Sequence, residues 1–197
     1  MTTACLDEAG RGSLIGDVYA GAVIWNPLIT HKNLKDSKKL SKKQRNEMYE
    51  FIKQNAIDYA IGFATNDEID QLNILNATHL AMHRALDGLK ETFEFIKVDG
   101  NRFKKYQNIH HECIINGDAI ESGISAASIL AKVEHDRHIE SLVQENLELE
   151  KYDLFHNMGY GTKNHINAIH LHGHTQWHRK TFKFKGKIKG NNNEQSR

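Results

Sequence analysis

Short runs of β-branched and aromatic residues alternate with longer amphipathic segments along this chain. Such runs are typical of β-strands when turn residues bound them. We predict strands at residues 18–25, 57–65, 93–98 and 109–115, with a weaker candidate at 2–6. The first strands follow one another closely, so we expect them to pair antiparallel, as hairpins do.

Helical periodicity is found in four longer segments, at residues 41–54, 73–90, 121–149 and 163–171. Ser41 is suited to cap the first of them, because its hydroxyl can accept a hydrogen bond from a free backbone N–H. The third begins with small residues, Ser-Ala-Ala-Ser at 125–128, which would let it pack closely against a sheet. Helices that alternate with later strands predict parallel crossovers, and therefore an α/β fold with a mixed sheet.

Composition changes this picture little. The chain has 197 residues, 39% of them hydrophobic, which suits one globular domain with a small appendage. Mean hydropathy is −0.60 and the N-terminus has no basic and apolar leader, so we expect no membrane span and no signal peptide. Cys5 and Cys113 form no CxxC pair, and we interpret both as reduced residues of a cytoplasmic protein.

Charge is distributed unevenly although the net charge is only +1. From Arg179 to the C-terminus there are seven basic residues and one acid, Glu194. This pattern favours a phosphate-binding arm beside an acidic body, and it fits a solvated tail about equally well. Residues 187–197, which include a run of glycine and asparagine, are predicted to be disordered.

A glycine-rich segment, Gly10-Arg11-Gly12, follows Asp7 and Glu8 at the end of the weak first strand. A dinucleotide-binding loop would continue into a helix, whereas this chain continues into the strand at 18–25. We therefore favour a different use of the same residues. The two carboxylates, brought together where the chain turns, would hold a cation, and the glycines and the guanidinium would approach a phosphodiester.

Two further acids follow predicted strands. Asp99 comes directly after the strand at 93–98, and Asp118 precedes the helix with the small residues. Three or four carboxylates would suit a site for two Mg²⁺ ions, although an isolated acid at a strand end is more often a turn residue. Asp136 is different, because it stands four residues after Lys132 and we expect it to form an ion pair on the helix surface.

Several blocks together resemble the ribonuclease HII family, also called type 2 ribonuclease H. In chain order the blocks are Asp7-Glu8-Ala9-Gly10-Arg11-Gly12, Asp36-Ser37-Lys38-Lys39-Leu40, Val98-Asp99-Gly100-Asn101, Gly117-Asp118, the run Ser125 to Val133, Gly159-Tyr160-Gly161-Thr162, and His178-Arg179-Lys180-Thr181-Phe182. Single blocks of this length recur by chance, but this many in one order are specific.

The resemblance implies a ribonuclease H-like fold, with a five-stranded mixed sheet flanked by helices and a helical C-terminal extension. On this basis we divide the chain into a catalytic domain at 1–145, a substrate-binding extension at 146–186 and the tail at 187–197. The implied activity is endonucleolytic cleavage of RNA in RNA–DNA hybrids, and on the 5′ side of single ribonucleotides in duplex DNA. The implied products carry a 3′-hydroxyl and a 5′-phosphate.

The resemblance also assigns residues. It implies that Asp7, Glu8, Asp99 and Asp118 are the catalytic acids and bind two Mg²⁺ or Mn²⁺ ions, with Asp7 bridging them. Gly10, Arg11 and Gly12 would contact the ribonucleotide and its 2′-hydroxyl, and Tyr160 would sense the junction with the next deoxynucleotide. Lys38 and Lys39 would contact phosphates, although a solvated face explains these lysines equally well.

Some positions depart from the family pattern. Ser13 and Asp17 stand where proline is usual, and Met158 replaces a common lysine, which puts loop rigidity and a phosphate contact in question. Five histidines between His165 and His178 raise the alternative of a zinc site, but their spacing matches no common zinc pattern.

We expect a monomer without a membrane partner, and the sequence does not support a sliding-clamp contact. The main alternative to an enzyme is a non-catalytic nucleic-acid-binding domain on the same fold.

Overall fold

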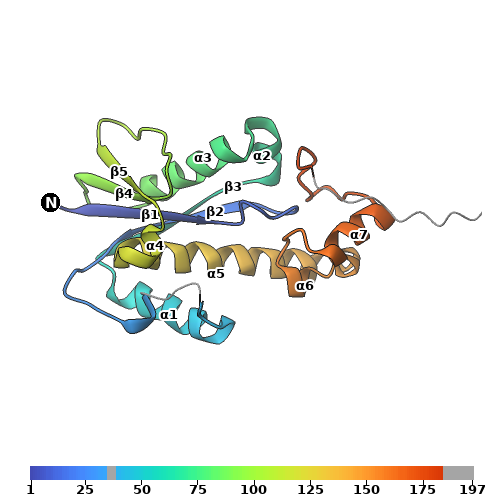
Figure 1. Ribbon diagram of the computed structural model, residues 1–197, viewed down its shortest axis with the longest axis horizontal. Coiled ribbons are helices and arrows are strands. Elements are labelled where there is room, and N and C mark those ends of the chain that lie inside the picture. Colours follow the sequence, from blue (N-terminus) through green and yellow to red (C-terminus); the bar gives the residue numbers. More distant parts are fainter. Residues whose placement is uncertain (35–38, 184–197) are drawn as a thin grey trace, which may run out of the picture.

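A computed structural model describes residues 1–34 and 39–183 (Figure 1). Its sheet has five strands in the order β3-β2-β1-β4-β5. The strands are β1 (Thr3–Ala9), β2 (Val18–Ile24), β3 (Asp58–Ala64), β4 (Phe95–Asp99) and β5 (His110–Ile114). Strands β1 to β3 pair antiparallel, while β4 pairs parallel with both β1 and β5. The predicted mixed sheet is therefore confirmed.

Helices cover both faces of this sheet. They are α1 (Lys42–Asn55), α2 (Asn66–Leu72), α3 (Ile74–Asp87), α4 (Gly117–Ile120), α5 (Ser122–Glu145), α6 (Leu154–Asn157) and α7 (Lys163–His172), with 3-10 segments η1 (Lys32–Leu34) and η3 (Leu147–Tyr152). Figure 1 shows α2 and α3 on one face, and α5 with α1 beyond it on the other. No helix in the described ranges is both long and apolar enough to span a bilayer.

The small residues at 125–128 have the predicted role. Gly21 in β2 lies so close to α5 that a Cβ there would collide with the carbonyl of Ala127. This close contact lets α5 bury Ala126, Ile129 and Leu130 against the sheet and α1. Helix α5 therefore packs along β1 and β2 and, being longer than either strand, extends beyond the end of β1.

Helix starts were predicted unevenly. Ser41 caps α1 in a capping box with Gln44, as expected. The helix predicted at 73–90 is confirmed as α3, which has Asn73 at its N-cap with a φ of 67° and ends earlier than predicted, at Asp87. The short helix α2 before it was not predicted. The start of α2 had a sequence signal that we did not use, since Thr65 and Glu68 form a second capping box.

The C-terminal extension packs on one end of this body. Leu14 and Ile15 from the segment after β1 share a buried cluster with Ile139 of α5, Tyr152 of η3 and Ile169 of α7. Helix α5 therefore contributes to the core of the sheet with its first half and to the extension with its second half. The boundary at residues 145 and 146 remains a prediction, because one continuous helix crosses from one cluster to the other.

Candidate active site

Asp7 and Glu8 lie inside β1, where the sequence predicted that the strand had already ended. The strand continues to Ala9 because Asp7 pairs with Gly21 and Glu8 with Ala20 on β2. Neighbouring residues of a strand point to opposite faces. The side chain of Asp7 accordingly contacts Ser128 of α5 and accepts a hydrogen bond from the backbone N–H of Glu8 at 2.7 Å.

Asp99 ends β4, next to these two acids. The parallel register pairs Leu6 with Val98, so Asp7 and Asp99 are each one residue beyond the last pair. Burial raises the pKa of Asp7 well above its ordinary value, and the negative charges of Glu8 and Asp99 raise it further. The pKa of Glu8 is also raised, chiefly by burial and in part by Asp99, against the opposing effect of Arg11, whose guanidinium lies 3.0 Å away.

Asp118 is the second residue of α4 and is buried, with 2% of its surface exposed. Its neighbour Gly117 donates its backbone N–H to Oδ1 of Asp99 at 2.6 Å. This bond ties the start of α4 to the end of β4. The fourth acid is therefore attached through the main chain to the edge of the sheet that carries the other three.

The oxygen donors of these four acids suit a hard divalent cation, and a cation would relieve the repulsion that raises the pKa values of Asp7 and Glu8. Within residues 1–34 and 39–183, however, no three Asp, Glu, His or Cys side chains are arranged to hold one ion. In this arrangement Asp7, Glu8 and Asp99 each accept a hydrogen bond from a donor of the protein.

A tight turn that contains Gly10, Arg11 and Gly12 follows β1, and we call it the glycine turn. Gly10 is buried with a φ of +86°, and a Cβ there would overlap the imidazole of His135. Gly12 is exposed, and a Cβ there would lie 3.6 Å from the ring of Tyr160, at an ordinary contact distance. The structure thus places Tyr160 next to the glycine turn, as a β-bridge between Ser13 and Tyr160 also shows.

The ring of Tyr160 packs against side chains of α5. The Nζ atom of Lys132 lies 5.0 Å from the centre of its ring, and the imidazole of His135 lies 5.7 Å away between centroids. Lys132 also donates to Asp136 at 2.7 Å, which confirms the predicted ion pair. Arg45 of α1 approaches the same carboxylate at 3.4 Å, so cationic groups from two helices gather beside the tyrosine.

Two cavities meet at Glu8. One of about 310 Å³ is lined by Arg11, Asp99 and residues of α3, among them His79. The other, of about 340 Å³, is lined by residues of α1 and α5 and by Tyr160. Of the four acids, Glu8 lines both cavities and Asp99 lines one of them, and Arg11 of the glycine turn lines the same cavity as Asp99.

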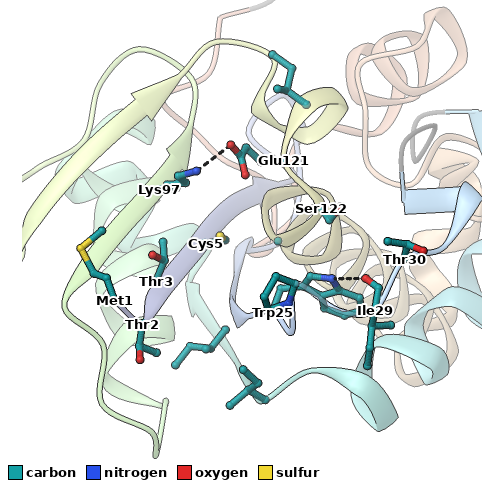
Figure 2. A pocket seen from close by; sticks show the side chains of 15 residues that line it. Met1, Thr2, Thr3, Cys5, Trp25, Ile29, Thr30, Lys97, Glu121 and Ser122 are labelled. Atoms are coloured by element: carbon teal, nitrogen blue, oxygen red, sulfur yellow. Dashed lines mark hydrogen bonds and ion pairs between the residues drawn. The ribbon is translucent and has the colours of Figure 1, made fainter.

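A cavity of about 510 Å³ lies elsewhere, around the first residues of β1 (Figure 2). Its wall contains an ion pair between Lys97 and Glu121 at 2.8 Å and the indole of Trp25, which donates to the carbonyl of Ile29. None of the predicted site residues lines it. Size alone therefore does not identify the candidate site, and the clustering of acids does.

The predicted phosphate-binding lysines are only partly described. Lys38 and the tail at 187–197 lie outside the described residues, and Lys39 is exposed just before α1. The basic arm needs a correction at its first residue, because Arg179 is 1% exposed and donates to backbone carbonyls of the protein. The sequence assigned Arg179 only to this arm, although it also stands in one of the blocks that carry the resemblance.

Two of the departures from the family pattern, Ser13 and Asp17, are accommodated by hydrogen bonds. Ser13 lies 3.1 Å from Nε2 of His135, and the carboxylate of Asp17 accepts the backbone N–H of Asn66 at 3.1 Å. Both side chains are buried. They therefore anchor the segment after the glycine turn at the positions where the family usually has proline.

Comparison with known proteins decides the family. A family profile described as ribonuclease HII matches residues 4–186. The chain belongs to the ribonuclease HII family. Ribonuclease HII from Bacteroides fragilis is 49% identical over 180 residues, covering 91% of this chain and 88% of that protein. The family consists of endoribonucleases, so this chain is a hydrolase that acts on nucleic acid.

Solved structures agree with the ribonuclease HII assignment. The ribonuclease H2 of Pyrococcus horikoshii superposes with a TM-score of 0.74 at 27% identity, covering 92% of this chain and 94% of that one. Bst-RNase HIII, solved in complex with Mn²⁺, shares the fold with a TM-score of 0.63 at 17% identity, covering 88% of this chain and 63% of that one. The predicted ribonuclease H-like fold is confirmed.

Proposed function

We propose that this ribonuclease HII cleaves the RNA strand of RNA–DNA hybrids and cuts duplex DNA on the 5′ side of a single embedded ribonucleotide. The products would carry a 3′-hydroxyl and a 5′-phosphate. One observation carries the proposal: Asp7, Glu8 and Asp99 lie at the adjoining ends of β1 and β4, directly beside the glycine turn and Tyr160.

Asp7, Glu8, Asp99 and Asp118 would hold two divalent ions, Mg²⁺ or Mn²⁺. Bound ions of this kind supply an activated water and stabilise the negative charge on a leaving 3′-oxygen. Loading would draw these acids away from partners that include the backbone N–H groups of Glu8 and Gly117 and the guanidinium of Arg11. Release of Arg11 from Glu8 would free its guanidinium for a substrate phosphate.

Substrate recognition would fall to the glycine turn and its neighbours. Gly12 is exposed and has no side chain, so its backbone can approach a ribose closely enough to contact the 2′-hydroxyl that distinguishes RNA from DNA. Tyr160 would pack against the sugar at the junction with the following deoxynucleotide. Lys132 beside Tyr160, together with Lys38 and Lys39, would neutralise phosphates, which predicts salt-sensitive binding.

The decisive experiment uses a DNA duplex that contains one ribonucleotide, labelled at the 5′ end of that strand, with Mg²⁺ or Mn²⁺ added. We expect one cut on the 5′ side of the ribonucleotide, and no cut in the same duplex made only of DNA. Failure to cut at any metal concentration would falsify the proposed function. Cleavage at a different bond would leave a nuclease whose products we have assigned wrongly.

Asp99→Asn supplies the matched test of the site. Asparagine can still accept the N–H of Gly117 and removes one of the repelling charges, so the protein should fold and be at least as stable as the wild type. Turnover should fall by about three orders of magnitude, because a neutral amide is a poor ligand for a divalent cation. Activity near that of the wild type would remove Asp99 from the metal site.

A further inference from the structure

Arg179 lies between the C-terminal extension and the glycine turn. Its guanidinium donates to the carbonyl oxygens of Gly10 at 2.8 Å, Arg11 at 3.1 Å, Gly16 at 2.9 Å and Asp17 at 3.0 Å. These four carbonyls belong to the two ends of the segment that leaves β1 and returns to β2. One side chain, more than 160 residues away in sequence, therefore fastens both ends of that segment.

The geometry requires an arginine. The guanidinium is planar and presents donors in several fixed directions, whereas a lysine ammonium is a compact group on a flexible stem. The side chain is 1% exposed, and Phe182 covers it with the ring centre 5.1 Å from the guanidinium carbon. Burial lowers the pKa of Arg179 to about 10, so the group remains charged at neutral pH and the carbonyl dipoles compensate its charge.

The main chain around Arg179 fixes the same segment. The backbone N–H of Arg179 donates to the carbonyl of Leu14 at 2.9 Å, and Gly16 donates to the carbonyl of Trp177 at 2.9 Å. On its other side Leu14 donates to the carbonyl of Gly159 at 2.8 Å, directly before Tyr160. The segment that follows the glycine turn thus lies between the strand-like chain at 177–179 and the backbone that carries Tyr160.

Gly10 has little freedom to move within this frame. The imidazole of His135 stands where a Cβ would be, and Arg179 binds the carbonyl of Gly10. Each carbonyl that points to Arg179 also fixes the peptide plane to which it belongs. The bond to Arg11 therefore sets the direction of the N–H of Gly12, because both atoms belong to the same peptide unit.

We propose that Arg179 is a positioning residue that orients the peptide groups of the glycine turn for recognition of the ribonucleotide. The inference rests on the proposed function, in which this turn contacts the 2′-hydroxyl. Arg179 itself touches neither substrate nor metal in this proposal. Its effect should therefore appear in the preference for RNA over DNA, beyond any effect on stability.

The test compares Arg179→Lys with Arg84→Lys. Arg84 also donates to a backbone carbonyl, that of Phe63, and pairs with Glu68, so its replacement should destabilise the fold without altering the glycine turn. Both variants are measured by thermal melting, by kcat and KM on a duplex with one ribonucleotide, and by Kd for that duplex and for its all-DNA counterpart. Binding is followed by fluorescence anisotropy without a divalent metal.

We expect Arg179→Lys to weaken binding of the ribonucleotide duplex and to raise KM by about tenfold, while the Kd for all-DNA duplex changes less than about twofold. Arg84→Lys should lower the melting temperature and leave the ratio of the two Kd values unchanged. A structural role alone would reduce the active fraction, and hence kcat, without changing KM or that ratio.

Phe182→Leu provides a second variant in case Arg179→Lys does not fold. It loosens the cover of the guanidinium while keeping all its donors, so it should shift the same ratio by a smaller factor. An unchanged ratio in the folded variants would overturn the role of Arg179. A wild-type protein that neither cuts nor prefers the ribonucleotide duplex would instead overturn the proposed function.

Discussion

The Nε2 atoms of His165 and His178 lie 3.2 Å apart in the interior of the C-terminal extension. Only one of two such nitrogens can carry the proton they share. The backbone N–H of Thr175 points at Nδ1 of His178 at 3.0 Å, which makes that nitrogen an acceptor. His178 therefore donates through Nε2 to His165, and His165 donates through Nδ1 to the carbonyl of Tyr160 at 3.0 Å.

This chain of hydrogen bonds requires both histidines to be neutral. Burial, together with the neighbouring His165 and His174, lowers the pKa of His178 to about 3. The pKa of His165 is also lowered by burial, although Asp153 partly opposes the shift. Tyr152 packs on His178 with the ring centroids 4.8 Å apart and brings no charge that would favour the protonated form.

We predict that acid destabilises this extension below about pH 6.5. The unfolded chain binds a proton at His178 near pH 6.5, while the folded chain stays neutral there until about pH 3. Between these values the unfolded state holds more protons, so the free energy of unfolding falls as pH falls. His178 alone should remove about 1 kcal/mol between pH 7 and pH 5.5.

Thermal melting from pH 7.5 to pH 5 measures this effect. His178→Gln can still donate an N–H to His165 and does not titrate, so it should be less stable at pH 7 but show a flatter pH dependence. His110→Gln, at an exposed position of β5, is the control and should keep the wild-type slope. A wild-type slope in His178→Gln would show that other groups cause the acid sensitivity.

The first part of the chain illustrates what sequence can predict. The β-branched and aromatic residues at 18–25 predicted the strand, and the small residues at 125–128 predicted the helix contact, because each pattern is local. Asp7 and Glu8 were recognised as a pair, but the strand was predicted to end before them. Their strand continues because β2 provides pairing partners as far as Ala9, and such pairing between strands is not visible in the local pattern.

The role of Arg179 could not be predicted from the sequence. A basic residue near a basic C-terminus resembles a phosphate-binding arm, and only the folded chain shows that it meets four carbonyls more than 160 residues earlier. Likewise, five closely spaced histidines raised the alternative of a zinc site, whereas in the structure His165 and His178 are hydrogen-bonded to each other. Contacts of this kind depend on tertiary packing and leave no periodic signal in the sequence.

Gly10 and Gly12 should respond differently to alanine. Gly10→Ala places a Cβ against the buried His135 at a φ of +86°, so it should lower the free energy of unfolding by about 2 kcal/mol or more. Gly12→Ala meets only the edge of Tyr160 at 3.6 Å and should melt as the wild type does. Its added methyl group would instead obstruct the ribose and raise KM for the one-ribonucleotide duplex.

Urea unfolding and steady-state kinetics on the two variants separate these effects. Gly161→Ala, just beyond Tyr160, provides a third alanine near the same turn for comparison of stability. Wild-type KM in a folded Gly12→Ala protein would contradict a close approach of substrate to Gly12. Wild-type stability in Gly10→Ala would mean that the turn can move away from His135.

Asp7 should lower the stability of the metal-free protein. The residue is 6% exposed, and its pKa is raised by burial and by the negative charges of Glu8 and Asp99. Asp7→Asn removes this repulsion and keeps an oxygen that can accept the N–H of Glu8. We expect the variant to be more stable than the wild type by about 1 kcal/mol in EDTA and to have no measurable nuclease activity.

Melting curves in EDTA and in millimolar Mn²⁺ check both expectations together. Metal should stabilise the wild type more than Asp7→Asn, because a ligand that binds only the folded state raises its stability. An Asp7→Asn protein that cuts the ribonucleotide duplex normally would exclude Asp7 as a ligand. Equal stabilisation of both proteins by Mn²⁺ would place the metal elsewhere.

Tyr160 should matter most at the junction between RNA and DNA. Its ring rests on Lys132 and His135, and its backbone is bridged to Ser13 beside the glycine turn, so the ring is held at a fixed place relative to the acids. Tyr160→Ala removes the surface on which the sugar after the ribonucleotide would pack. A long RNA–DNA hybrid offers many alternative positions for cleavage, whereas a single ribonucleotide offers one.

We therefore expect Tyr160→Ala to lower kcat/KM on the one-ribonucleotide duplex by about a hundredfold, and on a long hybrid by about tenfold or less. Tyr160→Phe keeps the ring and should retain most of the preference if packing of the ring carries it. Parallel assays of the three proteins on both substrates give the ratio directly. Equal losses on the two substrates would refute junction sensing, and a loss in Tyr160→Phe as large as in Tyr160→Ala would assign the role to the hydroxyl.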